Sequence, residues 1–142
     1  MSTEETVVTE EKKVLTDEER YGRLTELDPE LTIPVILSYK KKYDRVLATT
    51  MNGKVYLYRP ISRIEYTGLM TGLKIGESAT PFQQNQVVSE KIVEKCLLHP
   101  MNIVSEGFTN TKGGTVEALR EAIMFCSDFF SVDQVLAMTE EL

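Results

Sequence analysis

The chain has few of the residues on which metal centres and enzyme active sites are usually built. Its 142 residues include one histidine, His99, and two cysteines, Cys96 and Cys126. A single histidine excludes a multi-histidine metal site, and a zinc site would need all three of these residues together with a carboxylate. Two cysteines are too few for a disulfide framework and indicate reduced thiols in a cytosolic setting. We therefore expect no metal, no cofactor and no enzymatic activity.

Long apolar runs and an excess of basic charge are also missing. No run approaches the roughly 18 apolar residues of a membrane span, and the opening residues MSTEETVVTEEKK lack the apolar centre of a secretory signal. The formal net charge is -6, from 16 basic and 22 acidic residues, whereas nucleic-acid-binding proteins usually carry a basic face. These absences predict a soluble protein that binds neither membranes nor nucleic acid.

The negative charge is concentrated at the two ends of the chain. Residues 1–20 hold seven acids and three bases, and residues 132–142 hold three acids and no base. Residues 1–16 also lack aromatic residues and a sustained apolar period, so they cannot bury enough surface to offset the entropy lost on ordering. We expect a disordered acidic tail over 1–16 and a single domain over 17–142.

Hydrophobic periodicity and capping residues predict most of the chain to be helical. Expected helices cover 17–27, 34–43, 63–73, 83–98, 116–130 and 132 to about 142, separated by a loop at 74–82 and a linker at 101–114. Thr16 or Asp17 caps the first helix, and a strand is the alternative for the start of 34–43. Ser62 and Ser131 each begin a capping box, and Thr115 is the expected cap of 116–130.

A β-hairpin is the strongest local signal in the sequence. Two alternating β-prone runs, 45–51 and 54–59, flank Asn52-Gly53, and this pair fits a type I′ turn. Val55 and Leu57 then share one face of the hairpin, and Tyr56 and Tyr58 share the other. The fold class is a small, mostly helical α+β domain in which a hairpin at about 45–59 packs on four or five helices.

Two further predictions concern how the helices pack. Gly68 and Gly72 weaken the helix at 63–73, so we expect their spacing to serve the close approach of another backbone. Val132, Val135 and Leu136 are the expected apolar anchors of the last helix.

Several residue groups resemble chemical sites, but each has a more ordinary interpretation. The glycine-rich stretch 107–115 lacks the order of a phosphate-binding loop, and a helix-entry turn is the alternative. Cys96 and His99 have the spacing of a thiol–imidazole pair on one helix, yet Cys96 belongs to an apolar stripe. Glu117 and Glu121 have the spacing of paired carboxylates, but a solvated helix face is the favoured interpretation. The run Lys40–Lys42 is basic, and the favoured interpretation is a solvated helix edge or a contact for an acidic partner.

The candidate partner-binding residues are aromatic and aliphatic side chains. Tyr56 and Tyr58 on the hairpin have the residue type of interface anchors, with packing against helices as the favoured alternative. Phe125, Phe129 and Leu136 supply surplus apolar surface on the C-terminal helices. None of these groups combines a base, a nucleophile and an orienting residue.

Three motifs resemble segments of the small tail-morphogenesis proteins of contractile-tailed bacteriophages. The run YRPISRIEY at 58–66 resembles their hairpin-to-helix segment, and KCLLHP at 95–100 resembles the end of one of their helices. The run GGTVEAL at 113–119, with Ile123 and the later SDF, resembles another helix, although Asp128 stands where that family has glycine. The resemblance covers roughly residues 34–136.

The resemblance implies a tail assembly chaperone that binds the tape measure or another tail protein in the host-cell cytoplasm. A structural subunit retained in the virion tail or baseplate is the alternative. An unrelated bacterial interaction domain is a further alternative, and an enzyme is the least favoured. The implied partners are phage tail proteins, with a homo-oligomer also open.

Overall fold

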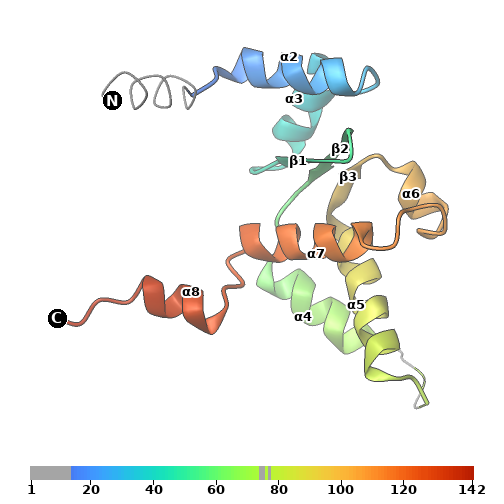
Figure 1. Ribbon diagram of the computed structural model, residues 1–142, viewed down its shortest axis with the longest axis vertical. Helices are drawn as coiled ribbons and strands as arrows, with labels where there is room; N and C mark the ends of the chain where they lie inside the picture. The colour runs from blue at the N-terminus through green and yellow to red at the C-terminus, as the bar shows by residue number, and fades with distance from the viewer. Residues whose placement is uncertain (1–13, 74–75, 77) are drawn as a thin grey trace, which may run out of the picture.

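The computed structural model describes residues 14–73, 76 and 78–142 of the chain. The predicted disordered segment therefore lies outside the described residues except for 14–16. The elements in chain order are α2 (Asp17–Leu27), α3 (Ile33–Lys42), β1 (Leu47–Met51), β2 (Lys54–Tyr58), α4 (Arg63–Gly72), α5 (Pro81–Cys96), β3 (Leu97–His99), α6 (Asn102–Ser105), α7 (Thr115–Cys126) and α8 (Val132–Ala137). The predicted α+β class is confirmed, since these helices surround one small antiparallel sheet (Figure 1).

The predicted hairpin forms the first two strands of that sheet. β1 pairs antiparallel with β2, and the connecting residues Asn52 and Gly53 have φ angles of 53° and 75°, as a type I′ turn requires. β3 adds to the other edge of β2, so the strand order is β1-β2-β3. The helix expected over 83–98 is therefore wrong at its end. The apolar period continues through Leu97, but the open edge of β2 takes residues 97–99 as a strand.

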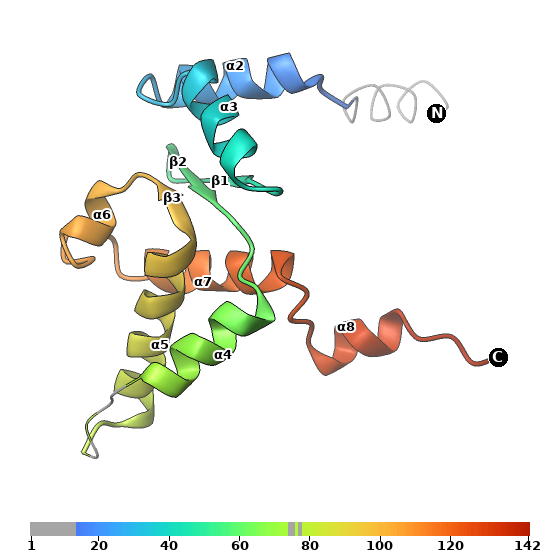
Figure 2. The same cartoon turned by 180° about the vertical axis from the view of Figure 1, so that it is seen from behind.

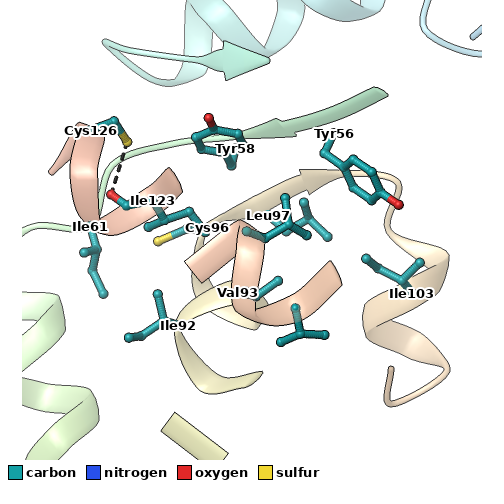
Figure 3. Close-up of a cluster of buried hydrophobic side chains, with 12 residues drawn as sticks. Tyr56, Tyr58, Ile61, Ile92, Val93, Cys96, Leu97, Ile103, Ile123 and Cys126 are labelled. Atoms are coloured by element: carbon teal, nitrogen blue, oxygen red, sulfur yellow. Dashed lines mark hydrogen bonds between the residues drawn. The ribbon is translucent and has the colours of Figure 1, made fainter. Parts of the chain in front are cut away.

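Both faces of the hairpin are covered, each by a different core (Figures 1 and 2). Val55 and Leu57 face α2 and α3 and pack with Leu24, Leu31, Ile36 and Leu98. Tyr56 and Tyr58 point to the other side, where α5 and α7 supply the larger cluster shown in Figure 3. The two cores follow from the alternation of side chains along a strand.

Local capping sets most of the helix starts. Thr16, Ser62 and Ser131 form capping boxes with the residues three positions later, which confirms those predictions. The helix expected to begin at 83 begins at Pro81, because Thr80 forms a further box with Gln83 and proline suits the first turn. The sequence contained this Thr-x-x-Gln signal across the boundary between the predicted loop, 74–82, and the predicted helix, 83–98.

The last long helix differs from its prediction at both ends. Thr115 is its first residue rather than its cap, which is Gly114. The helix expected to reach 130 ends at Cys126, and two residues later Asp128 has a φ of 66°. Asp128 thus takes up the left-handed backbone conformation that glycine adopts most easily, and it ends the helix there.

The glycine spacing in α4 does not serve close backbone approach. Among the described residues, no heavy atom beyond the adjacent residues and the helix's own backbone lies within 4 Å of a Cβ built at Gly68 or at Gly72. That prediction is wrong, because α4 rests on α5 through its larger side chains, including Tyr66, Leu69 and Met70.

The predicted anchors of α8 do not anchor it. Val132, Val135 and Leu136 are 75%, 47% and 64% exposed, and no residue of α8 is buried. Figures 1 and 2 show α8 extending away from α4 and α7. The prediction that these side chains pack on the domain is therefore wrong, and α8 is a projecting arm that ends at Ala137 rather than near 142.

Candidate interaction surface

The hairpin tyrosines are core residues. Tyr56 is 5% exposed and Tyr58 is 4% exposed, and burial raises the pKa of both phenols. The Tyr58 hydroxyl forms a 2.7 Å hydrogen bond with Thr49 on β1. The helices α5 and α7 cover the face of β2 on which both tyrosines lie. We therefore withdraw them as partner-binding candidates in favour of the alternative, in which they pack against helices.

Arg59 connects the end of the hairpin to two helices. Its guanidinium donates a bidentate pair of hydrogen bonds to Glu65 in α4, at 3.0 and 2.7 Å, and another at 3.2 Å to the carbonyl of Lys95 in α5. It also lies over the ring of Tyr43, 5.4 Å from the centroid. The Arg59 guanidinium lowers the pKa of Glu65 to about 2. This network ties the exit of the hairpin to α4 and α5.

Cys96 and His99 do not form a thiol–imidazole pair. Cys96 is fully buried, and burial raises the pKa of its thiol to about 12, so the nucleophilic thiolate is disfavoured. His99 lies on β3, not on the helix, and its Nε2 is 2.6 Å from Oδ2 of Asp28 at the end of α2. Cys126 is also buried, which raises the pKa of its thiol. The structural interpretation of both thiols is confirmed.

The other charged groups singled out in the sequence, two glutamates and three lysines, lie on two separate helices, α7 and α3. Glu121 is exposed, whereas Glu117 is half-buried and its Oε2 is enclosed without a hydrogen-bond partner among the described residues. Lys40, Lys41 and Lys42 lie exposed along the end of α3. The neighbouring Tyr39 is turned inward and donates to the carbonyl of Leu98 at 3.0 Å.

The glycine-rich stretch is a turn leading into α7. It follows the short helix α6, which occupies part of the predicted linker, and both Gly107 and Phe108 have positive φ angles. Gly114 provides the N-cap of α7 without a side-chain hydrogen bond. This geometry agrees with the helix-entry alternative.

Exposed apolar side chains gather where α7 ends and α8 begins. The C-terminal apolar surface, as we name it, consists of Phe125, Phe129, Phe130, Val132, Val135, Leu136 and Met138. Phe125 is 58% exposed and meets Phe130 edge-on, with 6.0 Å between ring centroids. Phe129 is less exposed, because its ring lies 4.8 Å from that of Tyr66. Of the five candidate residues, Phe125, Phe129 and Leu136 therefore remain available.

A cavity of about 370 Å³ lies within this surface, between the end of α7 and the start of α8. Phe125, Phe129 and Phe130 line it together with the basic residue Arg120. Arg120 is held in place by hydrogen bonds to Asn85 and to the buried Ser89, of 2.5 and 3.1 Å.

The described residues were searched for groups of side chains that could bind a metal ion and for helices that could span a membrane. Among residues 14–73, 76 and 78–142, no group of three or more histidine, cysteine, aspartate or glutamate side chains is placed to hold a metal ion. None of the helices in the same part of the chain has the length and apolar character needed to cross a bilayer.

Comparison with known proteins gives no relative: no family model, curated protein or solved structure matches this chain. The resemblance to phage tail proteins therefore remains a prediction from the sequence motifs.

Proposed function

We propose that this chain is a non-enzymatic assembly protein of a contractile bacteriophage tail, and that it acts as a chaperone for the tape measure or another tail protein. The observation that carries the proposal is the C-terminal apolar surface. It places seven large apolar side chains in solvent at one end of the molecule. Exposed apolar side chains gathered on neighbouring elements in this way are typical of sites of protein–protein contact.

The chemistry of that surface suits a helical partner. Phe125 and Leu136 lie on different helices with the 370 Å³ cavity near their junction, so a partner helix can place apolar residues against both. A tape measure is a long helical protein whose apolar seams need cover until the tail tube encloses it. The acidic ends of this chain add like-charge repulsion between complexes, which keeps them in solution.

Co-expression with the tape measure encoded in the same tail gene cluster tests the proposal. The two proteins are expected to co-purify from the cytoplasm of the expressing cell. The double substitution Phe125→Asp/Leu136→Asp should reduce the recovered complex about 10-fold or more, since losing one buried anchor commonly costs about 2 kcal/mol.

Phe82→Asp is the matched control. Phe82 is 74% exposed in the first turn of α5, away from the C-terminal apolar surface, so this variant should bind like the unmodified chain. Circular dichroism verifies that each variant is folded. Absence of co-purification, or equal binding by the double variant, contradicts the proposal. Peptide mass spectrometry of purified virions then distinguishes the chaperone, which is absent from them, from a retained tail or baseplate subunit, which is present in fixed copy number.

A further inference from the structure

A second apolar hollow lies at the opposite end of the molecule from α8. The N-terminal groove, as we name it, has a volume of about 300 Å³ and runs between α2, α3 and the edge strand β1. Its lining consists of Asp17, Arg20, Tyr21, Arg23, Leu24, Ile36, Lys40, Val46, Leu47, Ala48, Thr50 and Leu57. Figures 1 and 2 show the sheet and α7 lying between this region and α8.

The groove has an apolar floor and a basic rim. Leu24, Ile36 and Leu57 of its lining are core residues. Three bases and one acid contribute charge to the rim, and the acid, Asp17, is already paired with Arg20. Arg23 and Lys40 make no salt bridge within the described residues. The groove is therefore suited to an apolar segment that carries negative charge.

The α8 arm has these properties. Its apolar side chains Val132, Val135 and Leu136 are exposed, and they recur at the spacing of one helix face. Asp133, Glu140 and Glu141 are acidic, and residues 132–142 contain no base. Within residues 14–73, 76 and 78–142, no other element packs on the arm closely enough to bury one of its residues.

We propose that the α8 arm of one copy of this protein, while no tail protein occupies Leu136, docks in the N-terminal groove of a second copy. The apolar face of α8 covers the floor, and the acids of 132–142 face Arg23 and Lys40 on the rim. Within one chain the arm projects beyond the end of α7, well away from α2 and α3 (Figure 1), so the occupant comes from another copy.

The position of the two surfaces determines the type of assembly. The arm and the groove are different surfaces, so the contact is head-to-tail and generates either a closed ring or an open chain. The arm is a helix of six residues, too small to bury the roughly 1,200 Å² of a stable interface. The association is therefore reversible and depends on concentration and salt.

Disulfide capture between two purified full-length chains tests the contact. One chain carries Leu136→Cys, and the other, marked by a mass tag, carries Ala48→Cys on the exposed side of β1. The native thiols are buried and do not compete. Under mild oxidation we expect the mixed disulfide to form about 10-fold faster than with a Ser105→Cys chain, whose new thiol is exposed on α6, outside the groove.

Charge reversal then tests the complementarity. Arg23→Glu/Lys40→Glu in the groove chain, or Glu140→Lys/Glu141→Lys in the arm chain, should each reduce capture about 10-fold. The two reversals together should restore it. Lys41→Glu/Lys42→Glu changes the charge by the same amount on α3, the helix of Lys40, but outside the groove lining, so it should leave capture unchanged.

The proposal is overturned if the mixed disulfide forms no faster at Ala48 than at Ser105. It is also overturned if neither Arg23→Glu/Lys40→Glu alone nor Glu140→Lys/Glu141→Lys alone reduces the rate of capture. The test uses the purified chain alone, so it does not depend on the proposed tail function. If co-purification with the tape measure fails, the proposed contact between two copies is unaffected. If disulfide capture fails, the proposed interaction with the tape measure is unaffected.

Discussion

At the scale of single residues, the side chain of Arg59 joins separate parts of the chain. Its guanidinium lies over the Tyr43 ring and forms an ion pair with Glu65 at the start of α4. It also donates a hydrogen bond to the carbonyl of Lys95 near the end of α5. The Arg59 and Glu65 side chains are only 16% and 26% exposed, so water screens this pair less than a surface pair. One arginine therefore ties the hairpin exit to both helices.

We expect Glu65→Gln to destabilise the protein in a pH-dependent way. Arg59 lowers the pKa of Glu65 from 4.5 to about 2. The stabilisation is therefore complete above about pH 4.5, the ordinary value, and is lost as the pH falls toward 2. Glutamine retains the capping box, so the variant removes the charge alone. At pH 7 the free energy of unfolding should fall by roughly 2–3 kcal/mol.

Urea denaturation at pH 7 and at pH 2.5 measures this effect, and the difference between variant and parent should shrink at the lower pH. Glu94→Gln is the control, because Glu94 pairs with Lys91 at 3.7 Å while both side chains are about half exposed. It should change stability by less than about 0.5 kcal/mol. A Glu65→Gln deficit that is the same at both pH values contradicts the expectation.

At the scale of elements, α4 is a helix with weak intrinsic support. It contains two glycines in ten residues, buries no residue completely, and relies on the Ser62 capping box for its start. Neither glycine is required by a neighbouring backbone. Its glycines therefore cost helix stability without a compensating contact among the described residues.

Gly68→Ala should accordingly stabilise the protein by roughly 0.5–1 kcal/mol, because alanine loses less backbone entropy in a helix and finds free space here. The contrasting variant is Gly53→Ala. Its Cβ also meets no atom within 4 Å, but the φ of 75° disfavours alanine, so stability should fall by about 1 kcal/mol. Thermal denaturation, monitored by circular dichroism, measures whether each substitution raises or lowers the melting temperature. A lower melting temperature for Gly68→Ala would show that the helix tolerates no side chain there.

At the scale of the whole molecule, β2 lies between the two cores and belongs to both. Its alternate side chains enter the cluster under α2 and α3 and the cluster formed with α5 and α7. The His99–Asp28 contact adds a polar link between β3 and the end of α2. Losing either core therefore exposes a face of the same strand, and this couples the two halves.

We expect one cooperative unfolding transition. Leu31→Ala in the smaller core and Leu119→Ala in the larger core each remove a fully buried side chain, and each should cost about 2–5 kcal/mol. Both should shift the whole transition, as measured by far-ultraviolet circular dichroism and by tyrosine fluorescence. If Leu31→Ala shifts only part of the signal, α2 and α3 unfold independently and 17–142 is not a single cooperative unit.

Much of the fold was predictable because its signals are local. The Asn52-Gly53 turn and the boxes at Ser62 and Ser131 act within a few residues, so short patterns predict them. β3 was missed because a three-residue strand forms by pairing with β2, about forty residues earlier. The end of α7 was missed because Asp128 adopts a conformation usually reserved for glycine.

The candidate interaction residues divide in the same way. The sequence determined that the hairpin has two apolar faces and that the C-terminal segment is apolar and acidic, since these are properties of side-chain order and charge. The tertiary structure decided that Tyr56 and Tyr58 are buried while Phe125 and Leu136 are exposed. Exposure depends on which elements pack against a face. The helices α5 and α7 cover the tyrosine face of the sheet, whereas no element in the described part of the chain buries a residue of α8.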